Sequence, residues 1–193
     1  LWRDGARLDL PADPAAAEDA IGDFAGAAAA QGHRAFRARS RKVFEALEGS
    51  PAIRVAHAPA RRDAVLDADV VVASRDDAGD AAYVDPFAAA RKVSTDRLKW
   101  GVVTDGAAGA VASNARQILR AAGRPATVVD ATGAGDVFAA GLLEALAAGA
   151  GMDAAMEHAC VWGAIAVGFE GSAAAPGQAT FPAWSRQAGG ARP

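Results

Sequence analysis

The sequence contains only one cysteine, Cys160, in 193 residues, and no Cys-x-x-Cys pair. A single thiol cannot form an internal disulfide, and the absence of paired cysteines excludes the usual cysteine-based zinc motif. The N-terminus shows no charged segment followed by an apolar stretch, so no secretory signal is recognisable. We therefore expect a reducing, cytoplasmic setting.

Long apolar runs and basic runs are also missing. A membrane helix needs about 18 unbroken apolar residues, and the alanine-rich stretch at 25–30 is far shorter. The 20 Lys and Arg are outnumbered by 23 Asp and Glu, which gives a net charge of −3. A mildly acidic chain without a basic patch is a poor nucleic-acid ligand. Neither a membrane nor a nucleic acid is therefore expected as a partner.

Bulky apolar side chains are sparse. Hydrophobic residues make up 52% of the chain, but more than half of them are alanine. Stability must then depend on close packing of helices as much as on large side chains. The length fits a single domain, and no linker divides the chain. We therefore treat residues 1–193 as one domain.

What is present is an alternation of strand and helix patterns. Asp13 and Pro14 form a capping and first-turn pair that predicts a helix ending near Ala30. The apolar run at 69–73 is typical of a strand buried on both faces of a parallel sheet. Further helices are predicted over 40–47, 63–66, 137–148 and 153–167, and strands over 6–10, 52–56, 99–104, 110–113 and 126–129. Strand 110–113 should pair with 99–104, and the tail after Gly171 reads as loop. The alternation predicts an α/β fold with a mostly parallel sheet and the last two helices on one face.

One segment carries chemistry: residues 130–138, Asp-Ala-Thr-Gly-Ala-Gly-Asp-Val-Phe. It follows a predicted strand and opens a helix, where unpaired backbone N–H groups and the helix dipole favour an anion such as phosphate. Asp136 would lie in the first turn beside that anion. A carboxylate there is costly unless it accepts a proton from a hydroxyl that attacks phosphorus. The simpler alternative is a glycine turn followed by an ordinary first-turn acid.

The full pattern resembles the second signature of the ribokinase/PfkB family of carbohydrate kinases, and the resemblance extends over about residues 40–175. The Thr104–Ala110 segment resembles the family's strand–Gly-x-x-Gly–strand element, and Val70–Asp77 resembles the strand ending in Asn-x-x-Glu. Val55–Arg61, His158–Val167 and Glu170–Ser172 resemble an earlier strand, the helix that lines the adenine and the loop after it. The resemblance implies a ribokinase-like α/β fold.

The resemblance also implies roles for individual residues. Asp136 would be the catalytic base, and Gly133, Ala134 and Gly135 would form the anion hole for the transferred group. ATP would bind near Thr104, Gly106, Gly109, Cys160, Trp162 and Gly163. Mg²⁺ would be held through water by Ser74 and Asp77. A loop for a monovalent cation such as K⁺ would include Asp130, Thr132 and backbone carbonyls near Ala166, Phe169 and Gly171.

The implied activity is transfer of the γ-phosphoryl group of ATP to a hydroxyl of a sugar or related small alcohol. The alternative is a non-catalytic relative that binds a nucleotide or a sugar phosphate, because three features depart from the family pattern. The substrate-binding first half and its lid sheet are not recognisable, Asn-x-x-Glu is replaced by Ser74-x-x-Asp77, and Trp162 would either stack on adenine or block it. Many relatives dimerise through the lid, so a homodimer stays open. A dinucleotide-binding fold is not supported, because no Gly-x-Gly-x-x-Gly with a following acid is present.

Several other residues have a structural interpretation. His57 lies where the family often has an acid, but no metal-ligand spacing accompanies it or His158, so both are interpreted as structural. Cys160 is interpreted as a small buried side chain, and Trp100 as a packing residue. The basic residues at 37–42 and 61–62 are interpreted as solvated, with a phosphate-binding role for Arg61 as the alternative.

Overall fold

The computed structural model describes residues 2–3, 6–7, 13–58 and 65–171. Two short strands, β1 (Trp2–Arg3) and β2 (Ala6–Arg7), pair antiparallel near the N-terminus. The predicted strand at 6–10 therefore begins as expected, and its last three residues lie outside the described part. Arg61 and the tail after Gly171 also lie outside it.

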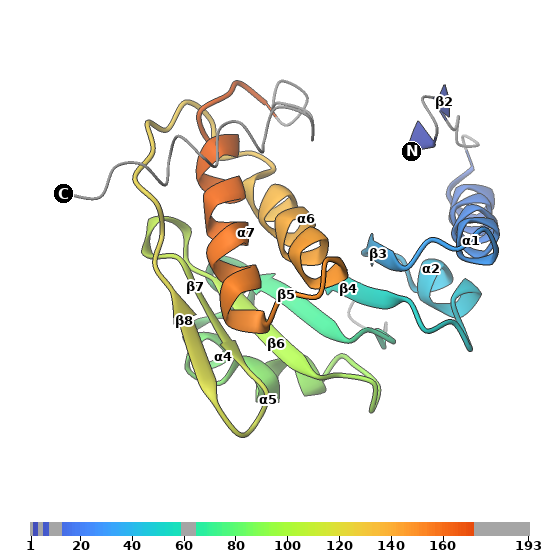
Figure 1. The fold of residues 1–193 in the computed structure, drawn as a ribbon, viewed down its shortest axis with the longest axis horizontal. Coiled ribbons are helices and arrows are strands. Elements are labelled where there is room, and N and C mark those ends of the chain that lie inside the picture. Colours follow the sequence, from blue (N-terminus) through green and yellow to red (C-terminus); the bar gives the residue numbers. More distant parts are fainter. Residues whose placement is uncertain (1, 4–5, 8–12, 59–64, 172–193) are drawn as a thin grey trace.

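The main sheet has six strands, ordered in space as they are in the chain, from β3 to β8 (Figure 1). The first four are parallel: β3 (Ala35–Ala38), β4 (Ile53–His57), β5 (Val70–Ser74) and β6 (Trp100–Thr104). The last two, β7 (Ala110–Ser113) and β8 (Ile118–Ala121), are antiparallel, and β7 pairs with β6 as predicted. The carboxyl ends of the four parallel strands thus lie along one edge, where open α/β sheets bind ligands.

Helices cover both faces of this sheet (Figure 1). The long helices α6 (Ala134–Ala147) and α7 (Met152–Ala166) lie side by side on one face. The short helices α3 (Arg75–Ala78), α4 (Asp80–Val84) and α5 (Pro86–Arg91) follow β5, and α4 and α5 lie on the other face. At the β3 end, α1 (Pro14–Ala30) packs on α2 (Arg41–Ala46), and Asp13 caps α1 as predicted, accepting a hydrogen bond from the amide of Ala16. In the described part of the chain, no helix is long and apolar enough to cross a bilayer.

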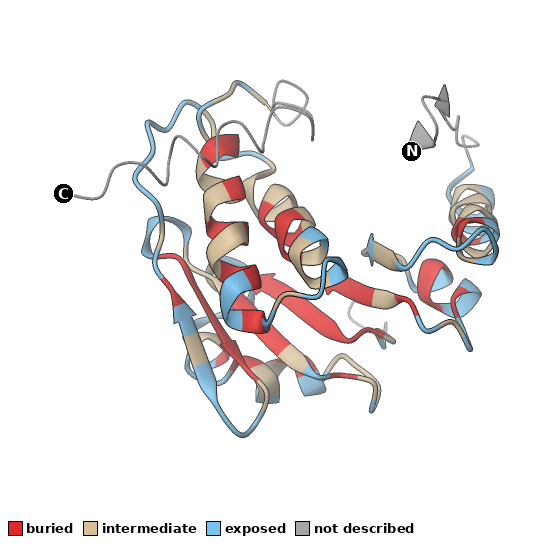
Figure 2. Ribbon diagram, viewed as in Figure 1, coloured by how far each residue is buried: buried red, intermediate tan, exposed pale blue. Residues whose placement is uncertain are grey.

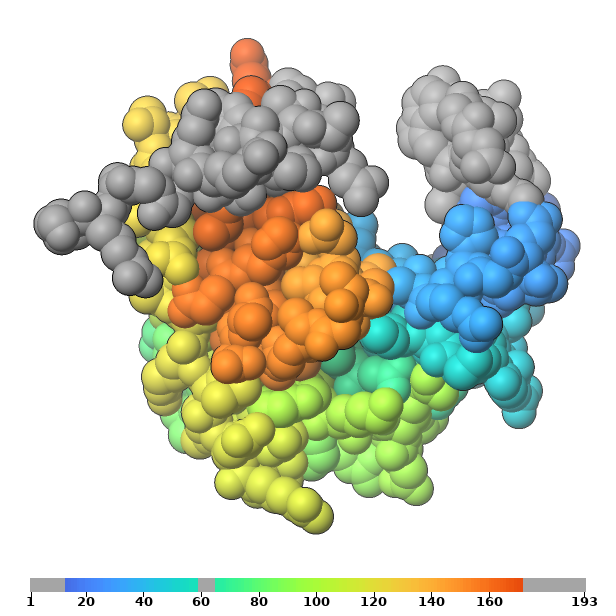
Figure 3. Space-filling model, in the orientation of Figure 1, coloured from blue at the N-terminus to red at the C-terminus, as the bar shows by residue number. Residues whose placement is uncertain are grey.

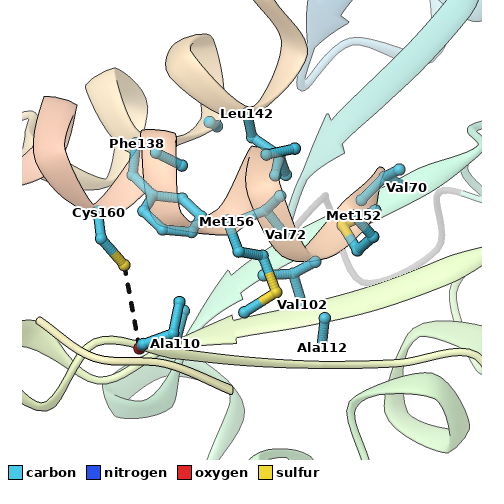
Figure 4. Close-up of a cluster of buried hydrophobic side chains, with 14 of the residues drawn as sticks. Val70, Val72, Val102, Ala110, Ala112, Phe138, Leu142, Met152, Met156 and Cys160 are labelled. Atoms are coloured by element: carbon cyan, nitrogen blue, oxygen red, sulfur yellow. Dashed lines mark hydrogen bonds between the residues drawn. The ribbon is translucent and has the colours of Figure 1, made fainter. Parts of the chain in front are cut away.

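The strands supply apolar side chains to both layers of the core. Val70 and Val72 on β5 pack with α6 and α7, where Phe138 and Met156 meet them (Figure 4). Val71, between them in sequence, belongs to the cluster on the opposite face. Because alternate residues of a strand point to opposite faces, this division confirms a strand buried on both sides. Figure 2 shows the central strands as the most buried part of the fold.

The α6–α7 interface shows how an alanine-rich chain builds its core. A Cβ on Gly141 would lie 2.8 Å from Cγ of Trp162, so only glycine lets the indole pack this close to α6. Trp162 and Ile165 form a cluster with side chains of α6, including Val137 and Ala140. In Figure 3 the surfaces of α6 and α7 join into one continuous layer over the sheet. Close helix packing therefore replaces bulky side chains, as the composition predicts.

The predicted strand at 126–129 is wrong. No strand is formed there, and Val128 and Val129 are exposed. The chain instead turns tightly after β7, with Asn114 accepting hydrogen bonds from the amides of Arg116 and Gln117, and β8 follows at once. The edge of the sheet is thus filled by Ile118–Ala121 before the apolar residues at 126–129 are reached.

The predicted helix at 63–66 is not observed in its described residues, 65 and 66. Leu66 is buried and forms a parallel bridge with Ser94. Its amide donates to the carbonyl oxygen of Val93, and its own carbonyl accepts from the amide of Thr95. This pairing with a distant segment outweighs the local helical pattern.

Gly109 gives a test of the turn between β6 and β7. Its φ is +97°, and a Cβ there would overlap the carbonyl oxygen of Ala121. We expect Gly109→Ala to destabilise the fold by about 3 kcal/mol, because backbone strain and a backbone clash add together. Gly106 is the matched control: its φ is +48° and nothing lies near its Cβ position, so Gly106→Ala should cost only about 1 kcal/mol. Urea unfolding measures both, and equal losses would show that the Ala121 contact does not matter.

Candidate active site

The centre of the site is the amino end of α6, which lies at the carboxyl edge of β3 and β4. Gly133 caps the helix with φ +81°, a left-handed conformation that favours glycine. The amide of Ala134 donates to the carbonyl oxygen of Ala131 at 3.2 Å. In the described part of the chain, the amides of Gly133, Gly135 and Asp136 have no protein acceptor. These three groups, and not the amide of Ala134, are therefore open to an anion.

Asp136 is surrounded by cationic and polar side chains from β3 and β4. Its Oδ1 accepts a hydrogen bond from Arg37 at 2.8 Å and lies 3.5 Å from a guanidinium nitrogen of Arg39. Nδ1 of His57, the last residue of β4, lies 3.2 Å from the same oxygen. The carboxylate stays 44% exposed, so it is accessible to a ligand while it is held in place.

The neighbours set the protonation state of Asp136. Partial burial by itself raises the pKa of the carboxyl, but the positive charge of Arg37, the interaction with His57 and the charge of Arg39 outweigh it. The net result is a pKa below the ordinary value for aspartate. Asp136 is therefore ionised at neutral pH and able to accept a proton.

His57 is buried and neutral. Burial lowers its pKa, and the charges of Arg39 and Arg37 lower it further, against the opposing effect of Asp136. The contact with a carboxylate oxygen favours a proton on Nδ1, which fixes the tautomer. The imidazole also packs against Gly135, whose Cβ position is 3.6 Å from Cε1. His57 thus packs against the first turn of α6 and supports it.

This burial predicts a pH dependence of stability. Because the folded-state pKa of His57 is lowered, the unfolded chain binds a proton that the folded chain does not, and stability falls as pH drops below about 6.5. The slope for one proton is at most about 1.4 kcal/mol per pH unit. We expect His57→Gln to flatten the slope of unfolding free energy between pH 6.5 and 5. The exposed His33 is the control, and an equal change for His33→Gln would contradict the assignment.

Asp130 joins the segment before α6 to the segment after α7. Its Oδ1 accepts from the amide of Thr132 at 2.8 Å, and its Oδ2 accepts from the amide of Gly171 at 2.9 Å. Hydrogen bonds from Thr132, and then from Gly171, lower the pKa of this carboxyl. The carbonyl of Val167 accepts from the amides of Val129 and Asp130, and that of Ala166 from the amide of Phe169. The five residues predicted for a cation loop, Asp130, Thr132, Ala166, Phe169 and Gly171, are therefore brought together.

Ser74 and Asp77 meet at the carboxyl end of β5. The Ser74 hydroxyl donates to Oδ2 of Asp77 at 2.7 Å, and the amide of Asp77 donates back to that hydroxyl at 3.1 Å. The pair caps the short helix α3. Arg75, between them in sequence, bridges Asp80 and Asp105 and so ties this helix to the end of β6. The predicted magnesium residues thus have a capping role of their own.

The β6–β7 turn presents the next group of predicted residues. Thr104 ends β6, and its hydroxyl lies 3.4 Å from the carbonyl oxygen of Ala73 on β5. The short helix η1 (Gly106–Ala108) is exposed beyond it, and Gly109 is buried against β8. The turn therefore lies at the same edge of the sheet as Ser74, one strand away on β5, and His57, two strands away on β4.

Three residues predicted near the nucleotide lie on α7. Cys160 is buried in the core with its Sγ 4.0 Å from the carbonyl oxygen of Ala121 (Figure 4), and burial raises its thiol pKa to about 11. Trp162 is buried against α6, and its ring centroid lies 5.5 Å from that of His158. A Cβ on Gly163 would lie 3.7 Å from Cβ of Phe138, an ordinary contact distance, so packing does not require glycine there. The structure gives Cys160 and Trp162 packing positions, and the burial of the Cys160 thiol does not support its predicted contact with a nucleotide.

Comparison with known proteins decides the family. A model of the pfkB family carbohydrate kinases matches residues 52–178, which include β4 to α7 and the whole Asp130–Asp136 segment. The chain belongs to this family. A comparison with curated protein sequences finds no match.

Solved structures of a ribokinase, a riboside kinase and a fructokinase share the fold. A ribokinase from Thermotoga maritima matches with a TM-score of 0.60 and 19% identity over 75% of this chain and 52% of its own. An aminoimidazole riboside kinase from Salmonella enterica, complexed with aminoimidazole riboside and an ATP analog, matches with a TM-score of 0.61 and 21% identity. The match covers 79% of this chain and 63% of that kinase. A fructokinase from Vibrio cholerae O395, in its fructose-, ADP- and calcium-bound form, matches with a TM-score of 0.57 and 22% identity. The match covers 79% of this chain and 61% of that kinase. This chain thus spans between half and two thirds of the length of these kinases.

Two residues of the site were not predicted from the sequence. Arg37 and Arg39 lie on and just after β3, outside the segment that the pfkB family model matches. They were interpreted as solvated, but both approach Asp136 across almost one hundred residues of sequence. The two arginines are two residues apart, and this separation puts both side chains on the same face of an extended strand. That alternation is the signal that could have indicated a shared target.

Proposed function

We propose that this chain forms the nucleotide-binding and phosphoryl-transfer part of an ATP-dependent kinase whose acceptor is a hydroxyl of a sugar or nucleoside. The observation that carries the proposal is the ionised Asp136 in the first turn of α6, beside three amides with no acceptor in the described residues. A carboxylate that faces an anion-binding helix end needs a chemical reason, and proton transfer during phosphoryl transfer provides one.

In this proposal Asp136 is the catalytic base. Oδ2 makes no hydrogen bond to the described residues, whereas Oδ1 is held by Arg37 and His57. Oδ2 is thus the oxygen that accepts the proton of the acceptor hydroxyl. Arg37 and His57 fix the carboxylate so that this oxygen faces the incoming group. The lowered pKa keeps the base ionised, at some cost in basicity.

The backbone of the first turn supplies the anion hole. The amides of Gly133, Gly135 and Asp136 are candidates to donate to the oxygens of the transferred phosphoryl group. Ala134 contributes differently, because its amide is used inside the turn and its small side chain keeps the approach open. Preformed donors of this kind stabilise developing charge without reorganisation.

The family and its nucleotide-bound members imply ATP and a divalent cation. The residues available for Mg²⁺ are Ser74 and Asp77, which offer oxygen atoms at the carboxyl end of β5, where Asp77 is exposed. Mg²⁺ keeps most of its water ligands and needs few protein oxygens, so this small donor set fits. A cation bound there would neutralise charge on the phosphates.

K⁺ would be held by the Asp130 segment. The carboxylate of Asp130 and the backbone around Ala166, Phe169 and Gly171 provide oxygen donors in one place. Asp130 joins the two segments by accepting hydrogen bonds from the backbone amides of Thr132 and Gly171. We propose that K⁺ adds order to this loop and thereby tightens nucleotide binding.

A non-catalytic nucleotide-binding relative is the second candidate. It is favoured by the ion pair between Arg37 and Asp136, which makes the carboxylate a weaker base, and by the Ser74–Asp77 pair, which is satisfied internally. Both features would persist in a protein that binds a nucleotide without turnover.

Release of ADP from Mg-ATP separates the two candidates. The folded chain is incubated with Mg-ATP, K⁺ and a panel of sugars and nucleosides, and ADP is measured against a sample without acceptor. The first candidate predicts ADP release that depends on an acceptor. Binding of Mg-ATP with no acceptor-dependent ADP over the whole panel would favour the second.

A further inference from the structure

Arg37 and Arg39 carry more positive charge than the site needs to hold Asp136. Both guanidinium groups approach a single carboxylate, and the neighbouring His57 is neutral. The other basic side chains nearby have separate partners, since Arg41 pairs with Glu45 and Lys42 with Asp19. Among the described residues, one positive charge is thus left over where α6 meets β3.

The two guanidinium groups are also open to a ligand. Their side chains are 30% and 52% exposed. A guanidinium has five N–H donors. Within the described residues, Arg37 uses one nitrogen, on Asp136, and Arg39 directs one nitrogen toward Asp136 and His57. The remaining donors form a planar fork that suits a carboxylate or a phosphate.

The order of the strands places these arginines on the acceptor side of Asp136. The turn proposed to contact the nucleotide follows β6, whereas Arg37 lies on β3 and Arg39 directly after it, three strands away. With strands about 4.8 Å apart, the two lie roughly 14 Å from each other, with His57 and α6 between them. Phosphoryl transfer needs the attacking and leaving oxygens in line, so an ATP that approaches from β6 requires an acceptor that approaches from β3.

We propose that Arg37 and Arg39 bind an anionic group of the acceptor, so that the acceptor is a sugar or nucleoside derivative bearing a carboxylate or a phosphate. This inference rests on the proposed function, because only phosphoryl transfer makes the β3 side the acceptor side. In this role both arginines determine specificity, and Arg37 in addition positions the carboxylate of Asp136. Both guanidinium groups contact Asp136, and an anionic acceptor would bind to their unused donors.

Calorimetric titration of the full chain tests the anion site without relying on turnover. The probes are D-gluconate, D-glucose 6-phosphate and neutral D-glucose, at low ionic strength. We expect at least one anionic probe to bind about 10- to 100-fold more tightly than glucose, as charge-assisted hydrogen bonds allow. The double variant Arg37→Gln/Arg39→Gln should abolish this preference. Arg41→Gln removes the same charge from α2 and should keep it.

Each outcome has a distinct meaning. A preference for gluconate alone or glucose 6-phosphate alone supports the site and identifies the acidic group. Binding of no anionic probe better than glucose, or a preference that survives in the double variant, overturns the inference. ADP release with the same probes reports separately on the proposed function. Anion binding without ADP release would contradict the proposed phosphoryl transfer but still support the anion site. ADP release that is equally fast with glucose would contradict the anion site but still support phosphoryl transfer.

Discussion

Asp136→Asn is expected to reduce phosphoryl transfer by about 10²- to 10⁴-fold, the range that a positioned general base contributes. Asparagine keeps the size of the side chain but cannot accept the hydroxyl proton. Affinity for Mg-ATP should change little, because the amides of the first turn remain. The measurements are ADP release at saturating acceptor and calorimetric titration with Mg-ATP.

A matched control for this variant is available on the adjacent helix. Asp153 is an exposed acid in the first turn of α7, so Asp153→Asn makes the same chemical change at a comparable helix position. We expect Asp153→Asn to leave ADP release unchanged. An Asp136→Asn protein that is folded, binds Mg-ATP and turns over like the unmodified chain would eliminate Asp136 as the base.

Arg54→Ala is expected to destabilise the fold by about 3–5 kcal/mol, the loss typical of breaking a buried charge network. The Arg54 side chain is 1% exposed and donates to the Asp67 carboxylate and the carbonyl oxygen of Leu47. Its own amide donates to Asp69 at 2.9 Å, so the residue connects α2, β4 and the start of β5. Truncating the Arg54 side chain leaves a cavity, and the Asp67 carboxylate and the Leu47 carbonyl oxygen lose their donor. Urea unfolding followed by circular dichroism measures the loss.

Two further variants separate packing from charge. Lys99 binds the same network through Asp69, but its side chain is 70% exposed, so Lys99→Ala should change stability by less than about 1 kcal/mol. Arg54→Met restores most of the buried volume without the hydrogen bonds, and it should recover part of the loss. An Arg54→Ala protein as stable as Lys99→Ala would show that the network does not stabilise the fold. If Arg54→Ala is too unstable to give a folded baseline in urea unfolding, the loss of stability is measured on Arg54→Met instead.

The parts of the fold that local chemistry dictates could be predicted from the sequence. The Asp13–Pro14 cap, the buried valines of β5 and the β6–β7 hairpin each depend on neighbouring residues, and the structure has all three. The resemblance of residues 130–138 to a family signature correctly indicated the family and the fold. The helix after it begins at Ala134, three residues before the predicted start, because the left-handed Gly133 already caps it.

What escaped prediction depends on contacts between distant segments. β3 is only four residues long and half-exposed, so its sequence has too little pattern to identify a strand. The encounter of Arg37 with Asp136 requires β3 and α6 to meet at one edge of the sheet, which no local rule supplies. The misplaced strand at 126–129 has the same cause, since the edge position is taken by β8, whose Ile118 is more than half exposed.

The most direct test of the central claim is a calorimetric titration of the folded chain with Mg-ATP, with and without K⁺. The account predicts binding in the micromolar range that tightens when K⁺ is present, because Asp130 and its partners order the loop that precedes the anion hole. Absence of detectable binding, in a sample whose circular dichroism shows the α/β fold, would contradict a nucleotide site at the amino end of α6.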